Sequence, residues 1–498
     1  MGVIFTFLMG LFMSFSPIND NDVFWHWVVG KWIDINKTVP TKELFSWYGT
    51  KMNYKWVSHE WLTEWIMYKV GPIGCIILMM LVFLGLYYLM FKMLRLSNKK
   101  LFDFRWLYLL LMTVFFKVTG PRPYIISLLF FAYLIYILFN YLDDAKPVFK
   151  KLIWTLPIMQ VLWVNLHGGS SSLPYIFIVG ILLSDFVLRL IPNCSKRWGE
   201  YLILNEKRKK LCLLFVSILA ASLINPVTYK MILYPFSNML DTNMIENILE
   251  WESPSFHGLL GIYIFIMIAV PIFNMIFTEK KYKFYEIAFL GLMFYMCLKS
   301  QRFIGMFGIY STWMLGKYFF VTDEIYNGLR KPFVKYEKII RFTFCTVLIF
   351  SLGAVGYKKI SSFNNIIDAS GYYSDENIKT VIQLQPQRLF NDYGHGGYLL
   401  YKLDEFDALS DIKIFSYGLG DVFSKDVLPD SAGISSIKRT SNIEKLLEKY
   451  DFDVILTAKM YSLHYYLNAR CDWDLVQSDE HGYVYVKNNS CKFESLTK

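Results

Sequence analysis

The chain has 498 residues, of which 55% are hydrophobic and 18% aromatic, and its formal net charge is +10. Soluble domains contain about 45 to 50% apolar residues even with glycine included, so this composition lies outside the soluble range. Long apolar runs account for the excess and indicate a membrane protein. The positive charge lies in loops between the runs, where anionic headgroups attract it, and is therefore weak support for nucleic-acid binding.

Eleven apolar runs predict membrane-spanning helices. A crossing needs about 20 residues, and fewer where the bilayer thins. The first run has no basic segment and no small-residue cleavage site, so it predicts a retained helix rather than a removed signal peptide. The spans are Ile4 to Phe15, Ile73 to Met90, Trp106 to Phe116, Tyr124 to Tyr141, Leu152 to Leu166, Tyr175 to Leu190, Leu211 to Ile224, Leu259 to Phe277, Ile287 to Leu298, Ile304 to Phe320 and Phe342 to Val355.

Alternate loops carry more lysines and arginines than the short loops between them. Positive residues near span ends are retained in the cytoplasm, which fixes the expected orientation. With an odd number of spans, we expect a multi-pass plasma-membrane protein whose N-terminus is cytoplasmic and whose chain after Tyr357 is extracytoplasmic. The basic loops follow the even-numbered spans: Lys92 to Arg105, Lys146 to Lys151, Lys196 to Lys210, Lys280 to Lys283 and Arg330 to Arg341.

Two regions interrupt the membrane pattern. The first outside loop, residues 16–72, is far longer than a helix connection requires, and long ordered loops tend to be functional. We therefore predict a transmembrane domain at residues 1–357, including this loop with its juxtamembrane helices, and an extracytoplasmic α/β domain at 358–498. The tail pattern predicts helices at Glu376 to Leu384 and Ile443 to Tyr450, and strands at Ile412 to Ser416, Val454 to Thr457 and Tyr483 to Lys487.

The seven cysteines show no metal-binding spacing. Five lie in or beside predicted spans and are expected to act as small apolar residues. Cys471 and Cys491 lie in the outside domain and could pair there, but the sequence alone does not supply the geometry that a disulfide requires.

Two carboxylates follow the first span directly. Asp20 and Asp22 stand in the run Asn19-Asp20-Asn21-Asp22-Val23-Phe24-Trp25-His26. A carboxylate at the outer membrane boundary could act as a general base or hold a divalent cation. Alternatively, Asn21 or Asp22 caps a helix that begins at Val23, and the two roles are compatible.

The same loop continues with His59 and Glu60 in the run Trp56-Val57-Ser58-His59-Glu60-Trp61-Leu62-Thr63-Glu64. This run predicts an interfacial helix on which Glu60 and Glu64 share a face. The tryptophans of the loop are typical of interfacial anchors. For His59 and Glu60, a substrate-binding role and simple solvation remain open.

Five further polar sites lie at the expected outer ends of other spans. Ionisable groups at membrane depth are costly and usually line a cavity or bind a ligand, although a single arginine there can be a headgroup anchor. Several such groups at one level favour a binding site, and arginine suits phosphate because its planar fork donates in pairs. The candidate substrate-binding residues are Arg122, His167, Asn225, Glu250 and Arg302.

The tail contains the run Phe390-Asn391-Asp392-Tyr393-Gly394-His395-Gly396-Gly397-Tyr398. It lacks both glycine patterns of nucleotide-binding loops. A tight turn is the simpler interpretation, and closure over a bound substrate is the alternative.

These motifs, in this order, resemble the bacterial membrane glycosyltransferases of the GT-C superfamily, relatives of the protein O-mannosyltransferases and the lipid A aminoarabinose transferase, and in particular a little-characterised subgroup. The resemblance implies an α-helical polytopic GT-C-like fold with a catalytic aspartate near the start of the first outside loop, here Asp20 or Asp22. It also implies a sugar donor linked to polyprenyl phosphate or diphosphate. The matching stretches include Asp20 to His26, Phe45-Ser46, His59 to Leu62, Arg122-Pro123, Leu162 to Gly168, Ile224 to Pro226, Glu250 to Pro254, Arg302-Phe303 and Asn391 to Tyr398.

The expected activity is sugar transfer to a cell-envelope glycan, lipid or protein on the outer face of the plasma membrane. A carboxylate would deprotonate the acceptor hydroxyl, and Arg122, His167 or Arg302 would stabilise the departing phosphate. The metal requirement is undecided, since it differs within the superfamily, and a divalent cation is one option. The alternatives are a transporter or flippase for lipid-linked sugars, and a non-catalytic envelope-assembly protein. Transporters commonly place charges at the midplane, whereas here they gather at span ends.

Overall fold

The computed structural model describes residues 4, 7, 8, 10, 11, 17–95, 105–115, 121–191, 193, 201–320, 328, 331–361, 366–437 and 440–491. The chain forms two compact units. The helical unit comprises Met1–Pro17, Ile73–Pro235 and Glu250–Ile366, and the mixed unit comprises Ile18–Pro72, Phe236–Leu249 and Ile367–Lys498. The first loop and the tail thus fold into one unit. The sequence pattern instead predicts the first loop as part of the transmembrane domain, residues 1–357.

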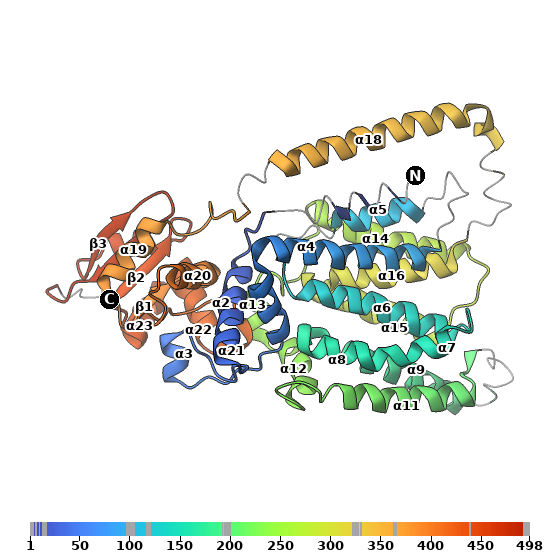
Figure 1. Cartoon of the computed structure of the whole chain (residues 1–498), viewed down its shortest axis with the longest axis horizontal. Coiled ribbons are helices and arrows are strands. Elements are labelled where there is room, and N and C mark those ends of the chain that lie inside the picture. Colours follow the sequence, from blue (N-terminus) through green and yellow to red (C-terminus); the bar gives the residue numbers. More distant parts are fainter. Residues whose placement is uncertain are drawn as a thin grey trace. The chain divides into compact units, whose positions relative to one another are not determined.

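The helical unit contains long apolar helices joined by short connections (Figure 1). Its first long helix, α4, bends at Gly71, where a φ of 66° and the following Pro72 break the helical hydrogen bonding. Only the part after the bend belongs to the helical unit. The elements are α4 (Trp61–Leu94), α5 (Arg105–Phe115), α6 (Tyr124–Leu142), α7 (Phe149–Leu152), α8 (Leu156–Leu166), α9 (Leu173–Leu190), α11 (Asn205–Ala221), α12 (Lys230–Met239), α14 (Leu259–Phe277), α15 (Phe284–Lys299), α16 (Ile304–Tyr318) and α18 (Glu337–Ser361).

Helix α16 forms the centre of the helical unit. Every one of its residues except Lys317 is buried. A Cβ at Gly316 would lie 1.9 Å from the carbonyl oxygen of Met93, so only glycine allows α4 and α16 to approach this closely. Helices α5, α6, α14 and α15 pack around α16. A helix that is apolar on all sides is expected at such a position.

Helical segments overlap each of the predicted spans from the second to the eleventh, whereas the first, Ile4 to Phe15, lies mostly outside the described residues. Four helical segments of the described chain are long and apolar enough to cross a membrane: Trp61–Leu94, Tyr124–Leu142, Gly168–Leu190 and Leu259–Phe277. The count of eleven spans is therefore not confirmed. Several of the other helices have fewer residues than the roughly 20 that a crossing requires; α15 has 16 and α16 has 15.

The mixed unit combines helices with a four-stranded sheet of order β1-β2-β4-β3. Strands β1 (Leu389–Asn391) and β2 (Val454–Ala458) are parallel, and β4 (Gly482–Lys487) pairs antiparallel with β2 and with β3 (Trp473–Ser478). The remaining elements are α2 (Asn21–Asn36), α3 (Trp47–Lys51), the start of α4, α13 (Thr242–Asn247), α19 (Asp375–Leu384), α20 (Gly396–Glu405), α21 (Gly420–Phe423), α22 (Val427–Ser436), α23 (Thr440–Tyr450) and α24 (Leu463–Asn468).

The predicted tail helices appear as α19 and α23, and two predicted strands appear as β2 and β4. The predicted strand at Ile412 to Ser416 is wrong: this segment makes one isolated bridge, between Ile414 and Ser46. Its backbone donors are satisfied in another way, since the N–H groups of Phe415 and Ser416 donate to Oδ1 of Asn391. The side-chain oxygen of Asn391 thus accepts the hydrogen bonds that a neighbouring strand would otherwise accept.

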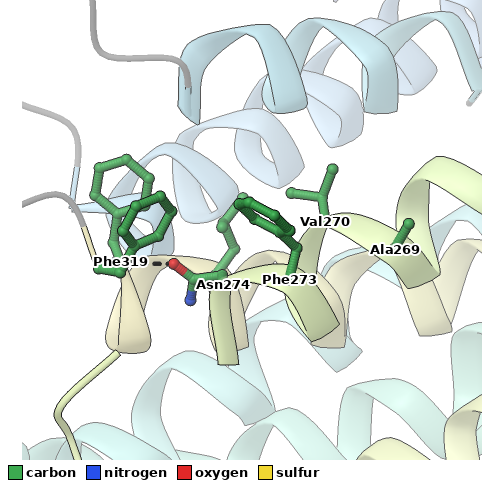
Figure 2. A pocket seen from close by; sticks show the side chains of 7 residues that line it. Ala269, Val270, Phe273, Asn274 and Phe319 are labelled. Atoms are coloured by element: carbon green, nitrogen blue, oxygen red, sulfur yellow. Dashed lines mark hydrogen bonds between the residues drawn. The ribbon is translucent and has the colours of Figure 1, made fainter. Parts of the chain in front are cut away.

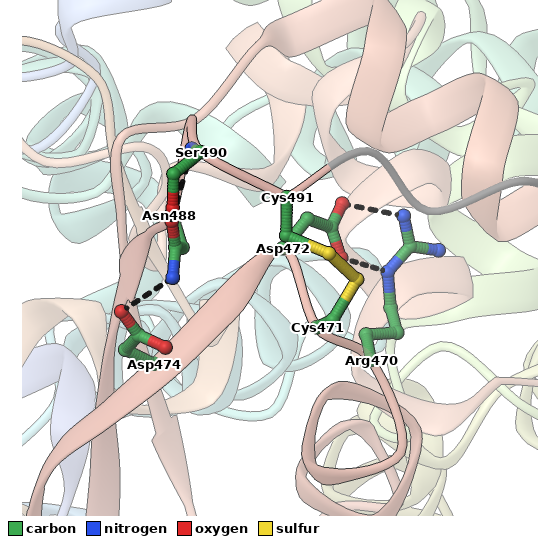
Figure 3. Close-up of a disulfide and its surroundings, with 7 residues drawn as sticks. All are labelled: Arg470, Cys471, Asp472, Asp474, Asn488, Ser490 and Cys491. Atoms are coloured by element: carbon green, nitrogen blue, oxygen red, sulfur yellow. Dashed lines mark hydrogen bonds and ion pairs between the residues drawn. A yellow bond between two sulfur atoms is a disulfide. The ribbon is translucent and has the colours of Figure 1, made fainter.

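Cys471 and Cys491 form a disulfide (Figure 3). Their Cα atoms are 5.8 Å apart, within the usual range for such a bond. Beside it, Arg470 donates to both carboxylate oxygens of Asp472, at 2.8 and 2.7 Å. The pairing left open by the sequence is therefore present, and it fixes the end of the chain to the start of β3.

We expect the disulfide to stabilise the mixed unit by about 3 kcal/mol, because it closes a loop between cysteines 20 residues apart and so restricts the unfolded chain. A Cys471→Ser/Cys491→Ser variant should unfold at lower denaturant concentration than the wild type. Denaturant titration of the detergent-solubilised chain measures this. A reductant should destabilise the wild type and leave the variant unchanged; an equal effect on both would contradict the assignment.

Candidate functional site

The site in the mixed unit begins at the N-terminus of α2. Asp20 caps this helix, and its Oδ1 accepts a hydrogen bond from the backbone N–H of Asp22, at 3.1 Å. Oδ1 of Asp22 accepts from Nε1 of Trp25, at 3.4 Å. The cap is therefore Asp20 rather than Asn21 or Asp22, and the helix begins at Asn21, two residues earlier than predicted. Capping holds both carboxylates at the positive end of the helix.

One turn further, His26 lies between two buried carboxylates from the start of α4 and the residue before it. Its Nδ1 is 3.2 Å from Oε1 of Glu64, and its Nε2 is 3.6 Å from Oε2 of Glu60. The other oxygen of Glu60 is 3.3 Å from Nε2 of His59. These four residues are called the acid–histidine cluster below. The cluster ties α2 to α4 through charge, beside the close approach of the two helices at Gly30.

The charges of the cluster favour the protonated imidazoles. Burial lowers the pKa of His26, but the hydrogen bond to Glu64 and the charges of Glu60, Glu64 and Asp22 outweigh it and raise the pKa overall. Burial likewise lowers the pKa of His59, while Glu60 and more distant carboxylates, including Asp421, raise it overall. Asp22 and Asp421 thus contribute to the electrostatics of the cluster from outside it.

The cluster has the composition of a divalent cation site. One ligand atom from each of His26, Glu60 and Glu64 lies within 4.8 Å of the others. Oε2 of Glu64 is buried and has no hydrogen-bond partner among the described residues, so a cation would satisfy it. Imidazole with two carboxylates is a common ligand set for first-row divalent metals. Binding would require a neutral His26, and a cation would therefore compete with a proton there.

The tail motif supports the carboxylates of α2 structurally. Its last glycines open helix α20, which packs directly against α2. Oδ1 of Asn21 accepts from the backbone N–H of Tyr398, at 2.9 Å. A Cβ at Gly397 would lie 2.2 Å from the carbonyl oxygen of Asn21, and a Cβ at Gly418 would lie 2.2 Å from Oδ1 of Asp22. Both glycines therefore permit the close approach that positions the start of α2.

A buried carboxyl group supports the same region from the first loop. Oε1 of Glu43 accepts from the backbone N–H groups of Phe45 and Ser46, at 2.7 and 2.8 Å, and from the hydroxyl of Tyr417, at 3.1 Å. Burial raises the pKa of Glu43 to about 7, although these three donors act in the opposite direction. At neutral pH this group is therefore close to half protonated.

In the helical unit, one segment brings three predicted residues together. Nη1 of Arg122 donates to Oε1 of Glu250. The backbone N–H of Arg302 donates to the carbonyl oxygen of Glu250, at 3.1 Å, and its guanidinium lies 5.2 Å from the centroid of the Trp251 ring. Since no carboxylate of the described chain pairs with the Arg302 guanidinium, it can accept an anion.

The two other predicted residues of the helical unit have defined local partners. Nδ1 of His167 lies 2.6 Å from Oγ of Ser127, which also accepts from Nε1 of Trp163, at 2.7 Å. Asn225 stabilises the turn after α11, since its Oδ1 accepts from the N–H of Val227, at 2.9 Å. These bonds orient His167 and explain Asn225 as a turn residue; their roles in substrate binding stay predictions.

Sequence reasoning assigned no role to His26, Glu43 or Gly418. For His26 a signal existed: it follows Asp22 by four residues and therefore shares its helix face. For Glu43 and Gly418 no signal existed, because their partners Tyr417 and Asp22 are 374 and 396 residues away in the chain.

No protein-family model matches the sequence, and no curated protein matches it. Solved structures do match the fold of this chain. The archaeal oligosaccharyltransferase AglB from Archaeoglobus fulgidus, in complex with an inhibitory peptide and a dolichol-phosphate, matches with a TM-score of 0.58 and 11% identity over 92% of this chain and 69% of that chain. The oligosaccharyltransferase of the same organism in its apo form matches with a TM-score of 0.55 and 10% identity over the same shares.

The chain has a fold like that of this archaeal oligosaccharyltransferase. At this identity the likeness shows the fold alone, so the bacterial subgroup inferred from the motifs stays a prediction. This fold together with the apolar helices indicates a membrane protein.

We expect Gly397→Ala to destabilise the mixed unit by about 1 to 3 kcal/mol, because the added methyl group must push α20 away from Asn21. The melting temperature of the solubilised chain measures this. Gly394→Ala is the matched control from the same motif, since the nearest atom to its Cβ, the hydroxyl oxygen of Tyr461, is 3.4 Å away. Equal melting temperatures of the two variants would contradict the close-approach argument.

Ionisation of the buried Glu43 makes the free energy of unfolding of the mixed unit depend on pH. Its pKa is about 7 in the folded chain against an ordinary value of 4.5, so its favourable contribution is complete below about pH 4.5 and is lost as pH rises through 7. Glu43→Gln keeps the acceptor oxygen but cannot ionise. Its stability relative to the wild type should therefore rise by up to about 3 kcal/mol between pH 5 and pH 8. Melting temperatures at both pH values test this; Glu448→Gln, which removes an exposed carboxylate, should give a constant difference.

Proposed function

We propose that the chain is a membrane glycosyltransferase that transfers a sugar from a polyprenyl-phosphate-linked donor to a cell-envelope acceptor. The likeness to an oligosaccharyltransferase over 92% of the chain carries this proposal. The AglB structure that matches contains a dolichol-phosphate, a lipid of the same chemical class as the proposed donor. The carboxylates at the start of α2 add the reactive groups that the fold by itself does not supply.

In the proposed reaction, the acceptor hydroxyl oxygen attacks the anomeric carbon of the donor. The hydroxyl proton passes to the carboxylate of Asp20 or Asp22, and the bond between the anomeric carbon and the phosphate oxygen breaks with its electron pair on the phosphate. The transfer is a direct displacement with inversion. Asp22 suits the base role better, because Asp20 already accepts a backbone hydrogen bond as the helix cap.

The leaving phosphate needs positive charge, which the helical unit can provide. Arg302 is the strongest candidate, since its guanidinium stacks on Trp251 and is not neutralised by a described carboxylate. Arg122 is neutralised by Glu250, so we assign it to positioning the Glu250 segment. His167 can donate a further hydrogen bond if its ring is protonated.

A divalent cation, if required, would be held by His26, Glu60 and Glu64, and would supply positive charge there. The disulfide supports an extracytoplasmic mixed unit, because such bonds persist in oxidising compartments. The outer face of the plasma membrane is therefore the proposed site of transfer.

We expect Asp22→Asn to reduce sugar transfer by at least 100-fold, because it removes the proposed base. Asp20→Asn should retain the helix cap, since asparagine caps as well as aspartate does, and should lose less activity. The assay measures transfer of radiolabelled sugar from polyprenyl-phosphate donors by the purified full chain in detergent.

Asp34→Asn, which removes a carboxylate near the other end of α2, is the matched control and should keep full activity. Full activity of the Asp20→Asn/Asp22→Asn double variant would eliminate the proposed base. No transfer by the wild type with any donor, combined with transport of lipid-linked sugar across vesicle membranes, would favour the flippase alternative.

A further inference from the structure

An apolar groove lies in the helical unit along the last turns of α14 and the end of α16 (Figure 2). Its volume is about 360 Å³, within the range of small-ligand sites. Aromatic and aliphatic side chains supply most of its wall, so an apolar chain is the ligand that fits it. The lining includes Val270, Phe273, Asn274, Leu315, Phe319 and Phe320.

The groove contains one buried hydrogen-bond donor. Asn274 is 2% exposed, and its Oδ1 accepts from the backbone N–H of Phe320, at 2.9 Å. Its Nδ2 has no hydrogen-bond partner among the described residues. Leaving a buried donor unpaired costs about 1 to 3 kcal/mol. Because this nitrogen is buried and the surface of the groove is entirely apolar, the groove itself suits an apolar chain alone.

Cations gather at the same end of the groove. Nζ of Lys280, three residues after α14 ends, donates to the carbonyl oxygen of Lys317, at 2.6 Å, two residues before Phe319. The guanidinium of Arg105 lies 4.3 Å from the centroid of the Phe319 ring. The guanidinium of Arg95 and Nζ of Lys317 lie 5.8 and 5.9 Å from the centroid of the Trp313 ring, and burial together with the neighbouring cations lowers the pKa of Lys280.

Part of this charge is not compensated within the protein. Lys317 is paired with Asp143 and Glu286, at 2.7 and 2.6 Å. In contrast, neither Lys280 nor Arg95 has a carboxylate partner in the part of the chain that the structure describes. Uncompensated cations beside an apolar groove favour an anionic headgroup over a zwitterionic one.

We propose that this groove binds one anionic phospholipid. One acyl chain occupies the apolar groove, and the phosphate lies against Lys280 and Arg95. The site is independent of the proposed sugar transfer, since it uses none of the residues assigned to donor or acceptor. By the expected orientation it faces the cytoplasmic leaflet.

Native mass spectrometry of the delipidated full chain tests the site with dioleoyl phosphatidylglycerol and dioleoyl phosphatidylcholine. The wild type should retain one phosphatidylglycerol molecule and bind phosphatidylcholine at least ten-fold more weakly. Arg95→Gln/Lys280→Gln should weaken phosphatidylglycerol binding about twenty-fold, because each cation near a headgroup contributes about a five-fold factor. Lys150→Gln/Lys209→Gln, which removes two exposed lysines elsewhere in the helical unit, should leave binding unchanged.

A second variant separates the contribution of the acyl chain to binding from that of the headgroup. Ala269→Phe fills the groove at α14 and should weaken binding of dioleoyl phosphatidylglycerol while leaving that of the dihexanoyl lipid unchanged. This variant decides the question if the double charge variant fails to fold. Equal binding of the two headgroups by the wild type, equal losses in both double variants, or unchanged dioleoyl binding by Ala269→Phe would each overturn the proposal.

Discussion

The buried imidazole of His26, held between Glu60 and Glu64, is the interaction on which the arrangement of the first loop depends. Burying two carboxylates is costly unless positive charge and hydrogen bonds compensate them. His26 provides that compensation and thereby fixes α2 against the start of α4. The position of Asp22, one turn earlier on α2, and of the cap residue Asp20 follows from this contact. A protonated imidazole and a divalent cation can both satisfy the cluster, so its charge balance is compatible with either state.

The second constraint is steric. The N-terminus of α2 lies against the tail motif at Gly397 and against Gly418, where any side chain would displace it. Thus a segment near residue 20 is positioned by segments near residues 397 and 418. Loops that carry reactive groups need a rigid support, because a small displacement of a catalytic carboxylate reduces the rate strongly. The mixed unit provides this support by packing the first loop and the tail into one core.

The sequence predicted the elements that have a strong local signal. Helix α14 begins and ends at the predicted residues, since apolar runs bounded by polar residues mark a helix directly. Helix α4 contains both a predicted helix of the first loop and a predicted span, with a bend at Gly71 between them. The apolar pattern did not indicate that these two helices are continuous. The strand predicted at Ile412 to Ser416 is absent, because the backbone N–H of Phe415 donates to the side-chain oxygen of Asn391 and not to a neighbouring strand. Arg122, Glu250 and Arg302 were expected to lie together because all three were predicted at outer ends of spans. The ion pair between Arg122 and Glu250 and the backbone contact of Arg302 depend on tertiary packing, which the sequence does not show.

Asp20 illustrates why residue type alone could not separate structural from catalytic roles. Aspartate is favoured as a helix cap and as a general base, so both interpretations predict the same residue at the same place. The geometry assigns the cap to Asp20, since its Oδ1 accepts from the backbone N–H of Asp22, whereas Asp22 lies in the first turn and its Oδ1 accepts from Nε1 of Trp25. A base must be able to take a proton, and a carboxylate oxygen already engaged by a strong backbone donor is less basic. Asp20 therefore orients the helix as its cap, and Asp22 is the residue that we propose as the base.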